Sequence, residues 1–307
     1  MKEIAIIFVL TFLIFLSSCA SNNCFLVSSE SSAESEIEII SSGEISKDDS
    51  SEGLSEDSSF VSDASDESLQ SSESPLQNQN TVINFPDKNF KKAIRVELGK
   101  PKGKITKTDV ENIIELEIIS QNVKDLSGIE YFTELKELRC IGNKLTKIDI
   151  SKNTKLERLD ISANKLSSLD ISKNTKLESL NCYNNKLTAL DVSKNGRLDY
   201  LGVSNNKLTA IDVSKNGRLY YLGVSNNKLT AIDVSNNANA KLEYLDFSYN
   251  KITSFNVDEN TKLIEINCSN NPLKKLSIKN KKLRSLFCEN NKLTKLDLSE
   301  STALTYL

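Results

Sequence analysis

The sequence predicts a mostly β solenoid, built of short repeats whose strands form one parallel sheet on the concave side. A 21-residue unit, Leu-x-x-Leu-x-(Cys/Val/Ile/Phe)-x-x-Asn-x-Leu, recurs from Leu135 to the end of the chain. The first part of each unit alternates apolar and polar residues, which is typical of a strand with one buried face. A unit this short cannot bury its apolar face alone, so neighbouring units must stack into one core.

The first residues predict secretion and a lipid anchor. The apolar run 4–16 is shorter than the about 20 residues that span a bilayer, and it matches the core of a signal peptide. Leu16-Ser17-Ser18-Cys19 follows and resembles the lipobox of bacterial lipoproteins, in which the signal is cut before an acylated Cys. The alternative is an ordinary signal peptide with a chance Cys. We expect residues 1–18 to be the signal and Cys19 to carry the lipid, on the outer side of the bacterial cell envelope.

An acidic, serine-rich stretch separates this predicted anchor from the predicted solenoid. Residues 28–77 contain 19 Ser, 14 Asp or Glu and one Lys. This composition offers too little apolar surface to offset the entropy lost on ordering, so we expect residues 19–80 to be a disordered, solvated tether. The stretch carries a net charge of −13 within a chain of −3, and residues 1–27 are neutral, which leaves +10 on residues 78–307.

Residues 81–112 predict a small helical cap. The apolar residues at 90, 93, 94 and 98 have helical spacing. Gly and Pro in 99–103 end this helix, and Thr106 and Thr108 offer N-caps for a second short helix over 110–113. A solenoid needs such a cap, because its first unit otherwise exposes an apolar face to water.

Residues 113–307 contain the repeats. An irregular first repeat begins at Ile113, and six of the eight regular units that follow are 21 residues long. A later alternating segment, such as 190–192, predicts a second extended run on the opposite side of the coil. The last repeat is incomplete, so we expect Leu304 and Leu307 to leave an open apolar edge. The regular units begin at Leu135, Leu156, Leu177, Leu198, Leu219, Leu242, Leu263 and Leu283.

One asparagine recurs at the same place in every unit. Its amide supplies two donors and one acceptor, so an inward-facing side chain can satisfy backbone groups where the coil turns. We therefore expect a structural role rather than ligand binding. The column begins at Asn122 in the irregular repeat and continues through Asn143, Asn164, Asn185, Asn206, Asn227, Asn250, Asn271 and Asn291.

The cysteines of the repeats predict buried free thiols. Cys140, Cys182, Cys268 and Cys288 occupy one slot that holds Val, Ile or Phe in other units. This interchange indicates an inward, apolar position, where Cys behaves as a small hydrophobic residue. A bridge between Cys268 and Cys288, which lie in adjacent units, is the alternative.

The sequence favours neither an enzyme nor a metal site. The chain has no His, the commonest general base and a common metal ligand, and we find no nucleophile motif, phosphate loop or cofactor motif. The segment that begins at Asp191 imitates a calcium loop, but Gly202 stands where the bidentate Glu belongs. No Arg-rich patch interleaved with aromatic residues indicates nucleic-acid binding.

Tyrosines mark one stretch of the predicted concave face. Tyr200, Tyr221 and Tyr244 share an outward strand position, and Tyr220 lies at its edge. Tyr is favoured in interfaces, and Gly202 and Gly223 beside the rings would leave room for a ligand. These four tyrosines are our candidate ligand-binding residues, with a self-stacked ladder that stabilises the sheet as the alternative.

The repeats resemble leucine-rich repeats over Ile113–Leu307. The form Leu-Thr-x-Leu-Asp-(Val/Ile)-Ser-Lys-Asn, as in 187–195, is similar to the repeats of bacterial surface proteins, and the Cys slot and the segments 83–87 and 126–131 are similar to internalins. The resemblance implies a concave face that binds a protein, on a host cell or in the envelope. We therefore expect a lipid-anchored surface protein for adhesion or recognition. The alternative is a structural envelope protein that packs against cell-wall polymers or other copies.

Overall fold

The computed structural model describes residues 81–235 and 241–307, which belong to the second of two units of the chain, Leu69–Leu307. The predicted signal, Cys19 and the predicted tether lie outside the described residues. Within the described ranges, no helix is long and apolar enough to cross a membrane.

Two short helices precede the repeats. Helix α3 (Lys88–Glu97) begins at Asp87, whose Oδ1 accepts from the backbone N–H groups of Asn89 and Phe90. Phe90 and Ile94 are fully buried and join the core of the repeats. The other carboxylate oxygen of Asp87 accepts from the N–H of Lys124 at 2.7 Å, so one side chain both caps the helix and holds it on the first repeat.

Helix α4 (Lys107–Val110) lies earlier than the predicted segment 110–113. The N–H and the hydroxyl of Thr106 both donate to Oδ2 of Asp109, at 2.7 and 2.9 Å. Of the two possible N-caps, Thr106 is therefore the one that is used, and the helix starts directly after it. The prediction was wrong by about one turn because Thr108 offered an equally good capping pattern.

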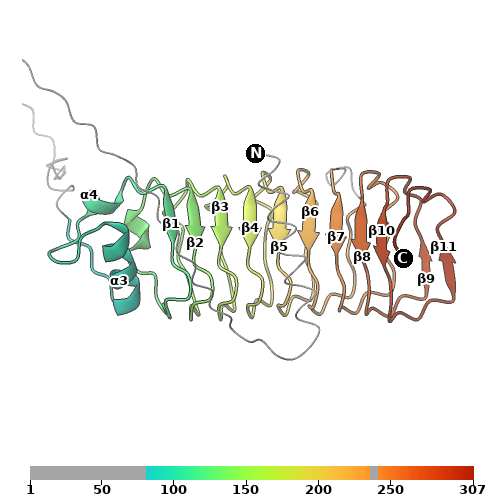
Figure 1. Ribbon diagram of the computed structural model, residues 1–307, viewed down its shortest axis with the longest axis horizontal. Coiled ribbons are helices and arrows are strands. Elements are labelled where there is room, and N and C mark those ends of the chain that lie inside the picture. The colour runs from blue at the N-terminus through green and yellow to red at the C-terminus, as the bar shows by residue number, and fades with distance from the viewer. Residues whose placement is uncertain (1–80, 236–240) are drawn as a thin grey trace, which may run out of the picture. The chain divides into compact units, whose positions relative to one another are not determined.

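The strands confirm the predicted parallel solenoid. Nine strands form one sheet in the order β1-β2-β3-β4-β5-β6-β7-β8-β10, and each pairs with its neighbour in parallel and in register (Figure 1). They are β1 (Glu115–Glu117), β2 (Glu137–Arg139), β3 (Arg158–Asp160), β4 (Ser179–Asn181), β5 (Tyr200–Gly202), β6 (Tyr221–Gly223), β7 (Tyr244–Asp246), β8 (Glu265–Asn267) and β10 (Ser285–Phe287). A 3-10 turn, η1 (Ile129–Tyr131), lies between β1 and β2, at the end of the irregular first repeat.

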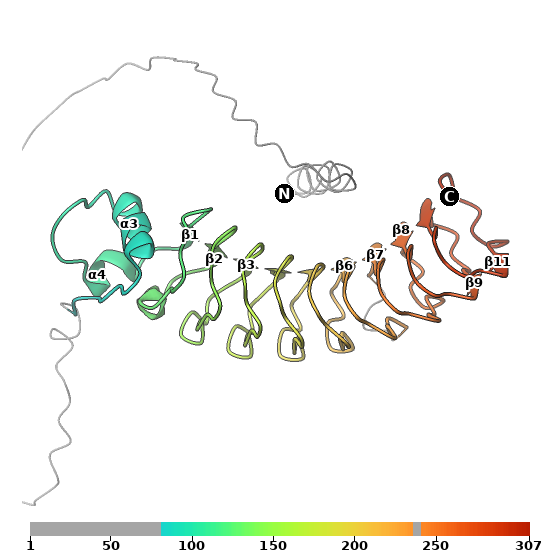
Figure 2. The ribbon, with the colours of Figure 1, turned by 90° about the horizontal axis from the view of Figure 1, so that it is seen from below.

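The sheet lines the inner side of a gently curved coil (Figure 2). The middle residue of a strand, such as Leu201, and the slot residue two positions later, Val203, are completely buried. These columns belong to one core that runs from the cap to the last turns. Each fully buried side chain of this size stabilises the fold by about 2 kcal/mol, so stacking supplies what a single unit lacks.

The slot cysteines are free, as predicted. Cys140, Cys182 and Cys268 are buried, and Cys288, in the last complete turn, is partly exposed. Burial raises the pKa of the Cys140 thiol to about 12. These buried thiols therefore act as core side chains rather than as nucleophiles.

The predicted second extended run is a regular strand only at the C-terminal end. β9 (Lys275–Ser277) and β11 (Lys295–Asp297) pair with each other in a separate two-stranded sheet. In earlier turns the equivalent segment forms no strand and ends in a tight turn, in which Oδ1 of Asp191 accepts from the N–H of Ser193 at 2.8 Å. The Asp-x-Ser turn alone does not account for the difference, because β11 ends in the same turn, in which Oδ1 of Asp297 accepts from the N–H of Ser299 at 3.2 Å.

The repeated asparagine turns inward after each strand. Oδ1 of Asn206 accepts from the N–H of Leu187 at 2.9 Å, and Nδ2 donates to the carbonyls of Cys182 and Val203, both at 3.0 Å. One amide thus joins two successive turns of the coil. The same donation to a previous turn is made by Asn143, Asn164, Asn185, Asn227, Asn250, Asn271 and Asn291.

Asn122 does not belong to this column. It is exposed with a φ of 60°, and the column position in the irregular repeat is held by Gln121, which is also exposed. Asn143 closes this turn instead, since its Oδ1 accepts from the N–H groups of Gln121 and Val123 at 3.1 and 3.0 Å. Burial of Val123 fixes the register one residue away from the predicted one.

A second asparagine column, not predicted from the sequence, closes the outer turn. Asn195 is completely buried, and its Nδ2 donates to the carbonyls of Ile171 and Asn174 at 3.1 and 2.9 Å. In the last turn Ser301 takes this place and donates to the carbonyl of Ile278. The column consists of Asn153, Asn174, Asn195, Asn216, Asn260 and Asn280.

Candidate binding surface on the inner sheet

Two columns of side chains project from the strands on the inner side of the coil. The first strand position carries Glu115, Glu137, Arg158, Ser179, Tyr200, Tyr221, Tyr244, Glu265 and Ser285. The third carries Glu117, Arg139, Asp160, Asn181, Gly202, Gly223, Asp246, Asn267 and Phe287. The register aligns each column along the sheet, so charge and aromatic character change stepwise from turn to turn.

In the N-terminal turns the charges of this surface pair with one another. Arg139 lies 3.3 Å from Glu117, and Arg158 lies 2.5 Å from Glu137. Along the neighbouring edge, Lys155 pairs with Glu134 and Lys136 with Glu157. Each exposed pair stabilises the fold by no more than about 1 kcal/mol. On the strands themselves they pair two of the four carboxylates of β1–β3, and Glu115 and Asp160 keep the surface acidic.

Tyrosines dominate the centre of the surface. The rings of Tyr200 and Tyr221 stack with centroids 4.5 Å apart and an interplanar angle of 6°. Both rings are half-buried, and burial raises the pKa of both phenols. Tyr244 continues the column, because it pairs with Tyr221 in the sheet register. The outcome is a flat aromatic surface on β5 and β6.

The two glycines do not leave the predicted room beside these rings. A Cβ at Gly223 would lie 2.9 Å from the hydroxyl of Tyr221, and one at Gly202 would lie 3.2 Å from the hydroxyl of Tyr200. Each ring therefore folds over the glycine of its own strand and fills the space. The glycines allow the rings to lie flat on the sheet, and a ligand would meet the ring faces rather than a cavity.

Carboxylates follow the tyrosines along the sheet. Oδ1 of Asp246 accepts from the N–H and the hydroxyl of Ser248, at 3.0 and 2.7 Å. Burial nevertheless raises the pKa of Asp246, and burial with the nearby Asp246 raises the pKa of Glu265. The surface thus changes from aromatic on β5–β6 to acidic on β7–β8.

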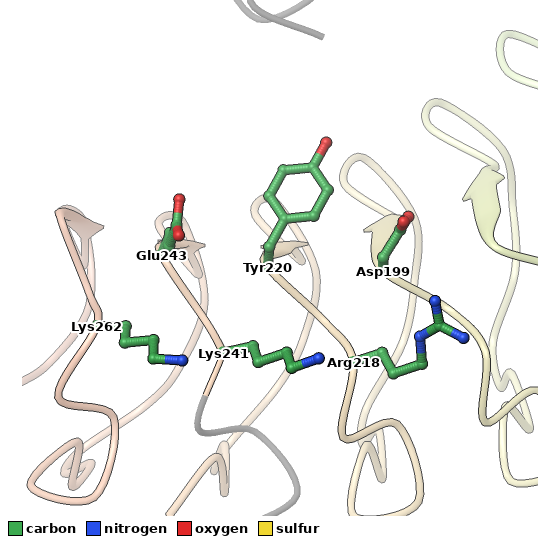
Figure 3. Close-up of a pocket in the computed structure, with 6 residues that line it drawn as sticks. All are labelled: Asp199, Arg218, Tyr220, Lys241, Glu243 and Lys262. Carbon is green, nitrogen blue, oxygen red and sulfur yellow. The ribbon is translucent and has the colours of Figure 1, made fainter. Parts of the chain in front are cut away.

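Tyr220 lines a shallow hollow at the edge of the sheet. The hollow has a volume of about 320 Å³ and is lined by Asp199, Arg218, Tyr220, Lys241, Glu243 and Lys262. The three basic side chains form one row, and Asp199, Tyr220 and Glu243 form the row beside it (Figure 3). Tyr220 therefore belongs to the edge of the sheet, whereas Tyr200 and Tyr221 lie on the strands themselves.

The calcium-like segment does not converge on a cation. Asp191 is exposed, whereas Asn195 is buried and donates to backbone carbonyls. Oδ1 of Asn195 is buried, so it cannot join the surface carboxylate of Asp191 around one ion. Among the described residues there is no group of three Asp, Glu or Cys side chains that could hold a metal ion.

Comparisons with known proteins agree with this architecture. A family model described as leucine-rich repeat matches residues 183–205 and 238–254. A leucine-rich repeat protein of Leptospira interrogans is 25% identical, with a TM-score of 0.52, over 59% of this chain and 56% of that one. The fold is a leucine-rich repeat solenoid.

Internalins are also among the similar structures. The functional domain of InlJ from Listeria monocytogenes is 32% identical over 75% of this chain and 61% of that one, with a TM-score of 0.49. Internalin C2 of the same species is 20% identical over 62% of this chain and 98% of that one, with a TM-score of 0.51. The solenoid thus spans less than two thirds of the InlJ domain and of the Leptospira protein. A comparison with curated proteins found no match.

Proposed function

We propose that this chain is a surface lipoprotein whose leucine-rich repeat solenoid binds a protein ligand, for adhesion or recognition. The ligand meets the inner face over β5–β8. The observation that carries the proposal is the asymmetry of this face. On β1–β3, two of the four outward carboxylates are held in ion pairs with Arg139 and Arg158, whereas β5 and β6 present a stacked tyrosine pair.

The chemistry of the aromatic stretch fits a protein partner. Half-buried Tyr rings combine a large apolar face with a hydroxyl and have little side-chain entropy to lose on binding, which is why Tyr is enriched in protein interfaces. The solenoid fold itself is typical of protein-binding domains. An extended, open surface without a deep cavity suits a macromolecule better than a small metabolite.

A capture experiment tests this assignment. The full chain is immobilised and exposed to envelope proteins and host-cell surface proteins, and the bound proteins are compared with those bound by Tyr200→Ser/Tyr221→Ser/Tyr244→Ser. We expect the variant to lose at least about tenfold in affinity for a captured protein, since several aromatic contacts of about 1 kcal/mol or more disappear together.

The matched control replaces three exposed lysines in the same turns, Lys207→Ser/Lys228→Ser/Lys251→Ser, which lie beyond the asparagine turn and off the strands. This control should keep the captured protein. Unchanged capture by the tyrosine variant contradicts the assignment. Capture of cell-wall polysaccharide in place of protein, unaffected by the tyrosine changes, supports the structural envelope role instead.

The lipid anchor at Cys19 is a separate proposal, supported by the apolar run and Leu16-Ser17-Ser18-Cys19. Labelled palmitate should enter the wild-type chain during growth and should be absent from Cys19→Ala. Cys24→Ala, which changes a nearby cysteine outside the lipobox-like segment, should keep the label. Label in the Cys19 variant would contradict the anchor.

A further inference from the structure

Two columns of charged residues run along the edge of the inner sheet, on either side of the first Leu of each unit. The basic column precedes this Leu and consists of Lys155, Lys176, Arg197, Arg218, Lys241, Lys262 and Lys282. The facing column follows this Leu. It is acidic in four turns, at Glu157, Glu178, Asp199 and Glu243, and holds Lys136, Tyr220, Ile264 and Arg284 in the others. Tyr220 stands between the two acidic residues Asp199 and Glu243.

Backbone hydrogen bonds fix how the facing column is spaced. The N–H of Tyr220 donates to the carbonyl of Asp199, and the N–H of Glu243 donates to the carbonyl of Tyr220, both at 2.9 Å. Asp199, Tyr220 and Glu243 therefore occupy three successive rungs. Burial and the nearby Glu178 raise the pKa of Asp199, and Arg218 of the following turn opposes this rise.

Lys241 has no carboxylate across from it in the facing column. Where Asp199 stands across from Arg218, Tyr220 stands across from Lys241, and the ammonium end of Lys241 lies below the ring in Figure 3. Arg218 and Lys262 are its neighbours in the basic column. The ion pairs between repeats, as far as the described residues show, all lie between Glu117 and Arg158, so none neutralises this hollow.

The charge of the hollow selects the kind of group that fits it. Its lining has three cationic and two anionic side chains, which leaves one positive charge. A single carboxylate balances that charge, whereas a dianionic phosphate would leave the hollow with one net negative charge. The partly exposed ring of Tyr220 offers an apolar surface in the row beside the basic side chains.

We propose that the hollow receives an acidic side chain of the protein ligand, with its carboxylate at Lys241 and its methylene groups on the ring of Tyr220. This inference rests on the proposed function, because the acidic residue would belong to the segment of the protein ligand that lies across Tyr200 and Tyr221. Tyr220 and Tyr221 are adjacent in the chain, so the hollow adjoins the aromatic surface. One or two residues of an extended segment, at about 3.3 Å each, bridge such neighbouring sites.

The test uses fluorescein-labelled oligoglutamate as the probe, at low salt, with the full chain. Lys241→Gln removes the cation across from Tyr220, and Tyr220→Glu places an acidic residue there, as Asp199 and Glu243 do in the neighbouring turns. We expect either change to weaken binding of the probe about tenfold. Lys207→Gln, which removes the same charge from an exposed site beyond the asparagine turn, should weaken it less than about twofold.

Equal weakening by all three variants would mean diffuse attraction and would overturn the proposal, as would the absence of probe binding by the wild type. Tighter binding of an oligogalacturonate of equal charge would assign the hollow to acidic saccharides and overturn the peptide proposal. Circular dichroism spectra that match the wild type show that each variant is folded. A captured protein that is lost in the triple tyrosine variant but retained by Lys241→Gln would overturn the hollow while leaving the proposed function intact.

Discussion

Replacement of Asn206 by Ala is expected to lower the unfolding temperature by about 10 °C. The change removes the hydrogen-bond partner of the N–H of Leu187 and of the carbonyls of Cys182 and Val203. These groups lie in a part of the coil that water does not reach. A buried polar group left unpaired costs about 1–3 kcal/mol, so a total of about 3 kcal/mol is a conservative expectation. For a domain of this size, 1 kcal/mol corresponds to about 2–4 °C.

Asn205→Ala is the matched control one residue away. Asn205 is partly exposed and has a φ of 55°, where Ala costs at most about 1 kcal/mol more than Asn. Its side chain accepts from Nδ2 of Asn226 at the surface, where water can replace the lost bond. We expect a decrease of about 3 °C by thermal denaturation followed by circular dichroism. Equal decreases for the two variants would contradict the structural role of the inward amide.

The solenoid was predictable because each structural position recurs in every turn of the sequence. A Leu that recurs every 21 residues must face the same way in every turn, so its burial in one unit implies its burial in all. The interchange of Cys140 with Val203 showed an apolar slot without any structural knowledge. The Asn206 column was predictable for the same reason, since nothing but a shared backbone geometry explains an amide in every unit.

The features that were missed depend on single turns or on competing local patterns. Asn195 lies in the segment that begins at Asp191 and imitates a calcium loop, and its own recurrence was not used, although the period that identified the Asn206 column applies equally to Asn195 and its equivalents. The exposed Asp191 and the buried Asn195 are separated by a backbone turn that a linear motif does not contain. Recurrence was thus a more reliable guide to burial than a motif.

The binding surface was only partly predictable. Register placed Tyr200, Tyr221 and Tyr244 in one column, as the strands show. The sequence did not reveal that the Tyr221 ring folds over Gly223, because ring orientation depends on neighbouring side chains rather than on strand period. The hollow at Tyr220 depends on which charged side chains pair across turns, and the sequence alone does not give those pairs.

Gly128→Ala is expected to be among the most destabilising single substitutions at the junction of cap and repeats. Gly128 has a φ of 106°, a conformation that L-residues adopt at a cost of about 1–2 kcal/mol. An added Cβ would also lie 2.7 Å from two ring atoms of Phe85 and 3.2 Å from Ile83. The Phe85 ring cannot retreat easily, because Phe90 of α3 packs against it edge-on with centroids 5.3 Å apart.

Overpacking of a buried site costs about 1–3 kcal/mol in addition to the backbone strain, so we expect a total of about 2–4 kcal/mol from Gly128→Ala. Gly103→Ala separates the two contributions, because Gly103 has a similar φ of 87° but nothing within 4 Å of the added Cβ. It should lose only the strain, about 1 kcal/mol. Urea denaturation measures both, and amide exchange should show faster opening of α3 and the first repeat in the Gly128 variant alone. Equal losses of stability for the two variants would mean that Phe85 has room to move. The cap would then be held to the solenoid by the hydrogen bond between Asp87 and the N–H of Lys124 rather than by this close packing.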